Sequence, residues 1–440
     1  MAAAAQGARA QVAGQGEGMH EQDTDKKQEG NATTQRAASL TVALINCVPT
    51  PRFDSAAMPM PRAGSRTAAS FLLSALRSGR LAAAGFAVAL LAACAPRYQP
   101  MGPVTAVPRI EERALVAADG IQLPIRWWLP AEGEPRAVIV ALHGMNDYSQ
   151  AFDRPAQAWA RDGIATYAYD QRGFGAGPQP GIWPGADTLA DDLYGAVRAV
   201  SVRHPDVPIY LLGESMGGAV IVAALSAPPP PGRPPLAGEI QGAVLSAPAL
   251  WGKDSMNPFY RAMLWLSSRL VPGMRVEPPA TLRITPSDNL AMLRSLGSDP
   301  RVLKRTRMDT LAGVADLMSR AEAGMQQLPG TLPLLVLYGQ NEEVLPRPSV
   351  TDALARWDAV RHDRPVRLAL YEQGYHMLLR DICARAVWQD VLAWLQAPDA
   401  PLSHANSPTA WLPDKKRALG PVERPETVDC PQGVDPLVWG

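Results

Sequence analysis

Residues 209–226 read IYLLGESMGGAVIVAALS, and this stretch decides the fold. Residues 209–212 form a short apolar run, which is typical of a strand buried on both faces. Residues 217–226 are small or apolar and predict a helix directly behind that strand. Between the two, Gly213-Glu214-Ser215-Met216-Gly217 places a serine on a sharp turn, where glycines remove side chains that would otherwise collide.

This order of strand, turn and helix is the context of a nucleophile elbow, which holds a serine hydroxyl at the carboxyl edge of a parallel sheet. The N-terminus of the following helix favours negative charge that develops during the reaction. We therefore predict that Ser215 is a catalytic nucleophile. The residue after it, Met216, is predicted to donate one backbone N–H to an oxyanion hole.

Strand-like and helical segments alternate around the elbow. Residues 114–130 predict a hairpin whose turn is Asp119-Gly120. Apolar runs predict further strands at 138–142, 165–169, 243–246, 334–338 and 366–371, and helical periodicity covers 187–202 and 382–395. This alternation predicts an α/β fold over residues 111–396, with a mostly parallel central sheet and helices on both faces. Residues 251–327 carry mainly helical signals instead, so we expect a helical cap inserted over the carboxyl edge of the sheet.

A serine hydroxyl is a weak nucleophile until a base takes its proton. In proteins with a nucleophile elbow the acid and then the histidine follow the serine in the sequence. His376 lies in a short loop after the run 366–371, so we predict that it is the base; a solvated loop histidine is the alternative. The acid is expected in the loop after 334–338, which offers Glu342 and Glu343.

His143-Gly144-Met145 follows the strand predicted at 138–142. The loop after this strand supplies the second N–H of the oxyanion hole, which we assign to Met145. We interpret His143 as a residue that fixes the loop rather than as a base.

Together these motifs resemble the monoacylglycerol lipase and lysophospholipase branch of the α/β-hydrolases, among the serine aminopeptidase S33-like hydrolases. The resemblance covers roughly residues 111–395 and rests on HGMNDYS (143–149), DQRGFG (170–175), GESMGGAV (213–220), ITPS (284–287) and RMDT (307–310). That branch places its acid at the fourth position of G-x-x-D. This implies Glu342 here, with glutamate in place of aspartate, and leaves Glu343 as the alternative. We interpret Asp170 and Arg172 as parts of a structural turn.

The resemblance implies an α/β-hydrolase fold and hydrolysis of a single-chain lipid ester, such as a monoacylglycerol or a lysophospholipid, without a metal or an organic cofactor. A general carboxylesterase and a peptidase of the proline-aminopeptidase type are alternatives. A non-catalytic, lipid-anchored binding protein on the same scaffold is a third, prompted by the missing aspartate. Apolar cap residues are candidates for an acyl slot or for ordinary core, namely Phe259, Met263, Leu264, Trp265 and Leu266.

The first hundred residues lie outside the predicted domain. Residues 1–65 are rich in alanine and small polar residues and read as disordered, or as a mis-assigned N-terminal extension. Residues 66–94 resemble a lipoprotein signal peptide, because arginines precede the apolar run 81–93, which is too short to span a bilayer. The run ends in LAAC (91–94), which resembles a bacterial lipobox; an apolar helix that ends in cysteine by chance is the alternative.

The lipobox resemblance implies a lipidated Cys94, a tether over residues 95–110 and attachment to a membrane surface, in the cell envelope on the periplasmic side of the outer membrane. Basic and acidic residues number 42 each, which gives no electrostatic reason to expect a nucleic-acid partner. Four cysteines without a C-x-x-C pair argue against a zinc site. Cys383 and Cys430 can pair if the chain is exported, although we favour a buried thiol and a thiol in the irregular, Pro-rich tail 397–440.

Overall fold

The computed structural model describes residues 95–229, 234–277, 284–358, 367–405, 430–431 and 435–437 of the 440-residue chain. The expected N-terminal extension (1–65) and signal peptide (66–94), with Cys94, lie outside these residues. Within the described part, no helix is both long enough and apolar enough to cross a membrane.

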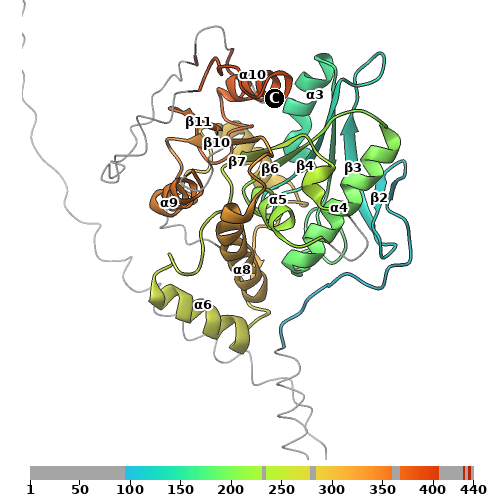
Figure 1. Cartoon of the computed structure of the whole chain (residues 1–440). Coiled ribbons are helices and arrows are strands. Elements are labelled where there is room, and N and C mark those ends of the chain that lie inside the picture. Colours follow the sequence, from blue (N-terminus) through green and yellow to red (C-terminus); the bar gives the residue numbers. More distant parts are fainter. Residues whose placement is uncertain are drawn as a thin grey trace, which may run out of the picture. The chain divides into compact units, whose positions relative to one another are not determined.

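Nine strands of the described residues form one sheet, in the spatial order β1-β2-β3-β5-β4-β6-β7-β10-β11 (Figure 1). The pairs β1–β2, β2–β3 and β3–β5 are antiparallel, and all pairs from β5 to β11 are parallel. The strands are β1 (Arg109–Ile110), β2 (Ala114–Val116), β3 (Gln122–Trp128), β4 (Ala137–Leu142), β5 (Ile164–Tyr169), β6 (Ile209–Glu214), β7 (Gly242–Ser246), β10 (Leu334–Gly339) and β11 (Arg367–Tyr371). The predictions of a mostly parallel sheet and of a hairpin over 114–130, now β2 and β3, are confirmed.

The parallel strands are buried on both faces because their side chains alternate between two cores. In β4, Val138 and Val140 belong to one core, and Ile139 and Ala141 belong to the other. The first core is covered by α4 (Ala186–Arg203), α5 (Met216–Ser226) and α9 (Arg347–Asp358), and the second by α3 (Asp153–Arg161) and α10 (Ala384–Gln396). Short 3-10 helices span Ser149–Phe152, Leu236–Gly238 and Met325–Gln327. The sequence predicts α4, α5 and α10, whereas α3 and α9 are polar enough to escape prediction.

The expected insertion lies between β7 and β10 and contains α6 (Pro258–Leu270), α7 (Leu290–Ser298) and α8 (Met308–Gly324). It also contains a small antiparallel sheet of β8 (Arg275–Val276) and β9 (Thr306–Arg307), which are too short to predict from the sequence. Helix α8 contributes Val314, Leu317 and Ala321 to the first core. This helix is therefore packed into the main domain rather than carried above it as part of a cap.

Helix α6 exposes most of its apolar side chains. Phe259 is 67% exposed and Trp265 is 57% exposed, and Met263 and Leu266 also face solvent. Leu264 is half-buried. The four exposed residues therefore form neither a closed acyl slot nor core, the two roles expected for them from the sequence.

Residues 95–110, expected as a tether, are bonded along the domain. The Gln99 side-chain Nε2 donates to Ile182 O at 2.7 Å. Further along, Met101 N donates to Thr188 Oγ1 at 3.1 Å. This part of the segment is attached to the domain surface, because its own backbone and side chains find partners there.

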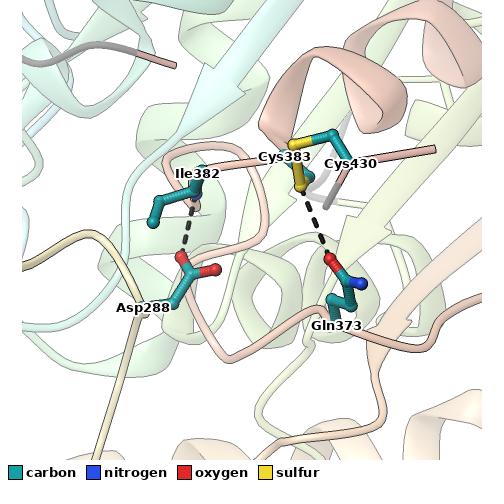
Figure 2. Close-up of a disulfide and its surroundings, with 5 residues drawn as sticks. All are labelled: Asp288, Gln373, Ile382, Cys383 and Cys430. Carbon is teal, nitrogen blue, oxygen red and sulfur yellow. Dashed lines mark hydrogen bonds between the residues drawn. A yellow bond between two sulfur atoms is a disulfide. The ribbon is translucent and has the colours of Figure 1, made fainter. Parts of the chain in front are cut away.

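The described part of the C-terminal tail contacts the domain, and two of its contacts lie beside the start of α10. Cys430 forms a disulfide with Cys383, at the start of α10 (Figure 2). Leu437 is buried, and its N–H donates to Ile382 O at 2.6 Å. The prediction of two unpaired thiols is therefore wrong, because the tail returns to the loop that leads into α10.

Candidate active site

Ser215 lies between β6 and α5 with φ 54° and ψ −114°, a backbone conformation that costs free energy for a residue with a side chain. Hydrogen bonds to the neighbouring segment hold it in place. Ser215 N donates to Ser246 O at 2.9 Å, and Ser215 O accepts from Ala249 N at 3.0 Å. The turn therefore presents a partly exposed serine among buried neighbours, as a nucleophile elbow does.

Two glycines allow the chain to turn so tightly. A Cβ on Gly213 would lie 2.5 Å from Gly217 C, and a Cβ on Gly217 would lie 2.2 Å from Leu142 O. These neighbours are backbone atoms of a packed sheet and helix, so a larger residue would displace the elbow. A Cβ on Gly144 would lie 3.4 Å from Ser215 Cβ, which shows that the loop after β4 passes beside the serine.

His376 and Glu342 form a buried pair. Nδ1 of His376 lies 2.7 Å from Oε2 of Glu342, and the two side chains are 6% and 0% exposed. The other carboxylate oxygen, Oε1, accepts from Val344 N at 2.6 Å and from Leu345 N at 3.1 Å. These bonds fix the carboxylate, which in turn orients the imidazole ring.

Glu343, the alternative acid, makes a different contact. Its Oε2 accepts from Thr285 N at 2.6 Å, in the segment that precedes α7. The residues alone do not decide which of the two adjacent glutamates is the acid. In the structure, Glu342 is the one that contacts His376.

The surroundings of His376 favour its protonated form. Burial disfavours the imidazolium, but the charge and hydrogen bond of Glu342, together with the charge of Glu214, outweigh burial. The pKa of His376 is therefore raised above its ordinary value of about 6.5, although Arg380 opposes the shift. A raised pKa suits a base that must take a proton from a hydroxyl group.

The three predicted triad residues follow parallel strands of one region of the sheet. Ser215 follows β6, Glu342 follows β10, and His376 follows β11. Because β6, β7, β10 and β11 are successive parallel neighbours, their carboxyl ends meet at the same edge of the sheet. This is the edge at which open α/β sheets bind their ligands.

The predicted oxyanion donors lie beside this serine. Met216 is the first residue of α5, so its N–H has no acceptor within the helix. Met145 follows Gly144 in the loop after β4, the loop that passes beside Ser215. Both N–H groups therefore belong to the segments that adjoin the serine side chain.

His143 holds that loop in place. Its Nδ1 donates to Gly144 O at 2.8 Å, and its Nε2 accepts from Gln171 N at 3.0 Å. Burial lowers the pKa of His143, which favours the neutral ring that can accept a hydrogen bond at Nε2. Since both ring nitrogens bond to the backbone, the interpretation of His143 as a residue that fixes the loop is confirmed.

The turn after β5 is also structural, as expected. Asp170 Oδ1 accepts from Ser149 N at 3.0 Å. Arg172 forms ion pairs with Asp119 at 2.8 Å and with Asp192 at 2.7 Å. Asp170 thus joins this turn to the loop after β4, and the Arg172 side chain joins it to the β2–β3 turn and to α4.

The insertion contacts the oxyanion loop directly. Asn146 Nδ2 donates to Thr306 Oγ1 at 2.8 Å, and Leu303 N donates to Asn146 O at 2.9 Å. Tyr148 Oη donates to Asp299 Oδ2 at 2.6 Å. A movement of the segment between α7 and β9 would therefore displace the oxyanion loop.

Arg380 is a residue of the site that the sequence analysis does not identify. Its guanidinium is 2% exposed and forms ion pairs with Asp147 and Glu214. No local signal marks this arginine, because its partners are distant in the sequence and only the folded sheet edge brings them together.

The chain matches the family model "Serine aminopeptidase, S33" over residues 133–382, more than half of its length. A monoacylglycerol lipase of Mycolicibacterium smegmatis is 26% identical over 294 residues, covering 64% of this chain and 96% of that protein. The human monoglyceride lipase is 25% identical over 319 residues, covering 71% of this chain and 98% of that protein.

Solved structures agree on the fold. A soluble variant of monoglyceride lipase from Saccharomyces cerevisiae, in complex with a substrate analog, has a TM-score of 0.52 at 20% identity and covers 69% of this chain and 99% of its own. The Paleococcus ferrophilus monoacylglycerol lipase has a TM-score of 0.50 at 19% identity and covers 62% of this chain and 98% of its own. The chain therefore belongs to the serine aminopeptidase S33 family and is an ester hydrolase with the α/β-hydrolase fold.

Proposed function

We propose that the protein cleaves single-chain lipid esters, monoacylglycerols or lysophospholipids, through a triad of Ser215, His376 and Glu342. The observation that carries the proposal is the buried contact of 2.7 Å between His376 Nδ1 and Glu342 Oε2, at the sheet edge that also presents Ser215. A serine at an elbow needs such an oriented base before it can attack a carbonyl.

In the proposed reaction, Ser215 Oγ attacks the ester carbonyl while His376 Nε2 takes the hydroxyl proton. The carbonyl oxygen becomes an oxyanion, which the N–H groups of Met145 and Met216 stabilise; loss of one such donor costs about 3 kcal/mol of barrier. His376 then protonates the leaving alcohol, and an activated water hydrolyses the acyl-enzyme. The carboxylate of Glu342 stabilises the imidazolium.

Two observations support lipid esters as the substrates. The two relatives described above, named for monoacylglycerol or monoglyceride lipase activity, are matched over almost their whole length. In addition, α6 exposes Phe259, Tyr260 and Trp265 in the insertion between β7 and β10. Clustered exposed apolar side chains commonly mark a surface for lipid or another apolar partner.

The substrate is tested with the purified protein and Ser215→Ala on monoacylglycerols, lysophospholipids, short p-nitrophenyl esters and prolyl amides. We expect the wild type to hydrolyse the lipid esters and Ser215→Ala to be inactive. Turnover of short esters alone would identify a general carboxylesterase, and cleavage of prolyl amides a peptidase. Failure of a fluorophosphonate to label the wild type would favour a binding protein on a hydrolase scaffold.

We also propose that Cys94 is lipidated and anchors the protein in the bacterial cell envelope, on the periplasmic side of the outer membrane. The sequence LAAC (91–94) supports this, and so does the pairing of Cys383 with Cys430, because disulfides persist in oxidising compartments. Palmitate should label the wild type but not Cys94→Ala, which should leave the membrane fraction. Equal membrane association of the two proteins would contradict the anchor.

A further inference from the structure

The guanidinium of Arg380 joins three segments of the active site, namely the loop after β4, the end of β6 and the loop after β11. Its Nη1 lies 2.7 Å from Asp147 Oδ2, and its Nη2 lies 2.6 Å from Glu214 Oε1. All three side chains are buried. Asp147 lies in the oxyanion loop, Glu214 directly precedes Ser215, and Arg380 follows His376 in the same loop.

Each end of this cluster also belongs to a turn that contains or directly follows a predicted reacting group. Asp147 N donates to Gly144 O at 3.3 Å and so closes the turn that contains Met145. Arg380 N donates to Met377 O at 2.8 Å, in the turn directly after the predicted base. A shift of the guanidinium would therefore be transmitted to both turns through short backbone connections.

Stability alone is a weak reason for such a cluster. Removing three charges from water is costly, and well-packed apolar residues often stabilise a fold equally well. A guanidinium contributes a defined geometry instead, because its planar fork fixes the separation and the angle of the two carboxylates that it binds. The position of the cluster, between three catalytic loops, indicates that this geometry serves the reaction.

The cluster also faces the predicted base. Besides its triad partner, the charged groups that act on His376 are Glu214, which raises its pKa, and Arg380, which lowers it. The same loop holds Asp381, where burial and the charge of Asp288 raise the carboxyl pKa well above its ordinary value. Arg380 thus holds the Glu214 carboxylate, one of the charges to which the base responds, in a fixed place.

We propose that Arg380 is a positioning residue, which holds the oxyanion loop, the elbow and the histidine loop at fixed separations through Asp147 and Glu214; this rests on the proposed function. Arg380 itself contacts no reacting atom in that reaction. A displacement of about 1 Å at a reacting group can lower a rate about 100-fold. Loss of Arg380 should therefore lower kcat and leave KM little changed.

The chain contains a matched control. Arg172 is buried too and also bridges two carboxylates, Asp119 at 2.8 Å and Asp192 at 2.7 Å. Its partners lie in the β2–β3 turn and on α4, away from the residues that adjoin the triad in the sequence. The bonds from this turn to the oxyanion loop come from Asp170 and Gln171, not from the Arg172 side chain. Arg172→Met therefore removes the same kind of ion cluster and leaves those bonds in place.

The first test compares Arg380→Met, Arg380→Lys and Arg172→Met in the full chain. It measures kcat and KM on a p-nitrophenyl ester and the rate at which a fluorophosphonate labels Ser215, each per folded molecule. We expect kcat and labelling to fall roughly 10- to 100-fold in Arg380→Met, and less in Arg380→Lys, which keeps the charge but not the fork. Arg172→Met should keep the wild-type kcat even where its melting temperature falls. A folded Arg380→Met with wild-type kcat, or an equal loss in Arg172→Met, overturns the proposal.

The second test leaves Arg380 in place and serves equally if Arg380→Met does not fold. Asp147→Asn and Glu214→Gln each neutralise one partner at constant shape, and both should lower kcat. The acid limb of kcat/KM should move to lower pH in Glu214→Gln, because a charge that raises the pKa of His376 is lost. It should not move in Asp147→Asn. Wild-type kcat in both variants, or the same pH shift in both, contradicts the proposal.

The labelling rate separates this proposal from the proposed substrate. A wild type that labels at Ser215 but leaves monoacylglycerol intact refutes the lipid substrate, while the labelling rates of the Arg380 variants still decide the role of Arg380. A wild type that no fluorophosphonate labels overturns both proposals, because there is then no activated serine to position.

Discussion

Nδ1 of His376 lies 2.7 Å from Oε2 of Glu342, and two backbone N–H groups hold the other oxygen of that carboxylate. The loops that carry the two residues are also bonded through the backbone, since Asn341 N donates to Gly374 O at 2.9 Å. The separation of acid and base is therefore set by the adjacent strands β10 and β11. A glutamate can replace an aspartate here because its carboxylate is tied back to its own loop.

The acid limb of the activity is expected above pH 6.5. Burial opposes protonation of His376, but Glu342 outweighs it and raises the pKa, and only neutral His376 can accept the serine proton. The kcat/KM for an uncharged ester should therefore rise with pH through a midpoint above about 6.5. In Glu342→Gln the charge that raises the pKa of His376 is lost, while burial still lowers this pKa, so the midpoint should fall. In the same variant kcat should decrease about 10⁴-fold. An unchanged midpoint in this variant would argue against Glu342 as the acid.

The same pKa predicts how stability depends on pH. A histidine whose folded pKa is raised stabilises the folded state fully below its unfolded value of about 6.5, and this contribution is lost as the pH rises through the folded value. Urea unfolding of the wild type and His376→Asn measures the contribution. The advantage of the wild type should be greater below pH 6.5 than at alkaline pH; an advantage that grows with pH would contradict the sign of the shift.

Gly217→Ala is expected to disrupt the elbow. The new Cβ would lie 2.2 Å from Leu142 O, so we expect a loss of unfolding free energy on the order of 3–5 kcal/mol, together with the loss of activity. Gly297→Ala, in α7, is the matched control because, apart from its chain neighbours and the backbone of its own helix, nothing lies within 4 Å of its Cβ position. Helix propensity then favours alanine by up to about 1 kcal/mol. Thermal and urea unfolding compare the two; a neutral Gly217→Ala would refute the close approach.

The Cys383–Cys430 disulfide is expected to stabilise the folded state. It attaches the tail to the loop before α10, and its removal should cost about 2–5 kcal/mol. Cys383→Ser, Cys430→Ser and the double variant should unfold at the same denaturant concentration, because each removes the same bond. A reducing agent should bring the wild type to that value and leave the variants unchanged. Additive losses in the double variant would show that the two cysteines are not paired.

Exposed apolar residues of α6 are expected to matter for aggregated lipid and not for soluble esters. Phe259→Ser and Trp265→Ser should lower activity on monoacylglycerol vesicles several-fold, because these side chains are well placed to contact an apolar surface. Both variants should keep wild-type activity on a soluble p-nitrophenyl ester. Val202→Ser is the control, since Val202 is 73% exposed near the end of α4, outside the insertion. An equal loss on both substrates would assign α6 a structural role instead.

The elbow and most of the sheet can be predicted because their determinants are local. A strand is recognised from its own apolar run, and Gly213 and Gly217 mark the turn around Ser215 without reference to distant residues. The order of serine, acid and histidine along the chain then leads to the loops of Glu342 and His376. The sheet topology then brings these loops together, since parallel strands place their carboxyl ends at one edge of the sheet.

What escapes prediction depends on contacts between distant segments. Arg380 resembles any other arginine until the fold places it against Asp147 and Glu214. The pairing of Cys383 with Cys430 depends on the path of the tail and on the redox compartment. The choice between the adjacent carboxylates Glu342 and Glu343 came from the family resemblance and not from the residues alone, and the contact of Glu342 with His376 agrees with it.

The most direct test of the proposed triad is steady-state hydrolysis of one monoacylglycerol by the wild type, Ser215→Ala, Glu342→Gln and Glu343→Gln. The two glutamine variants are adjacent in the sequence and identical in chemistry, and they differ in whether the replaced carboxylate contacts His376. The account predicts no activity in Ser215→Ala, a steep fall in kcat in Glu342→Gln and nearly wild-type kcat in Glu343→Gln. Wild-type activity in Ser215→Ala, or a fall in Glu343→Gln as large as in Glu342→Gln, would contradict it.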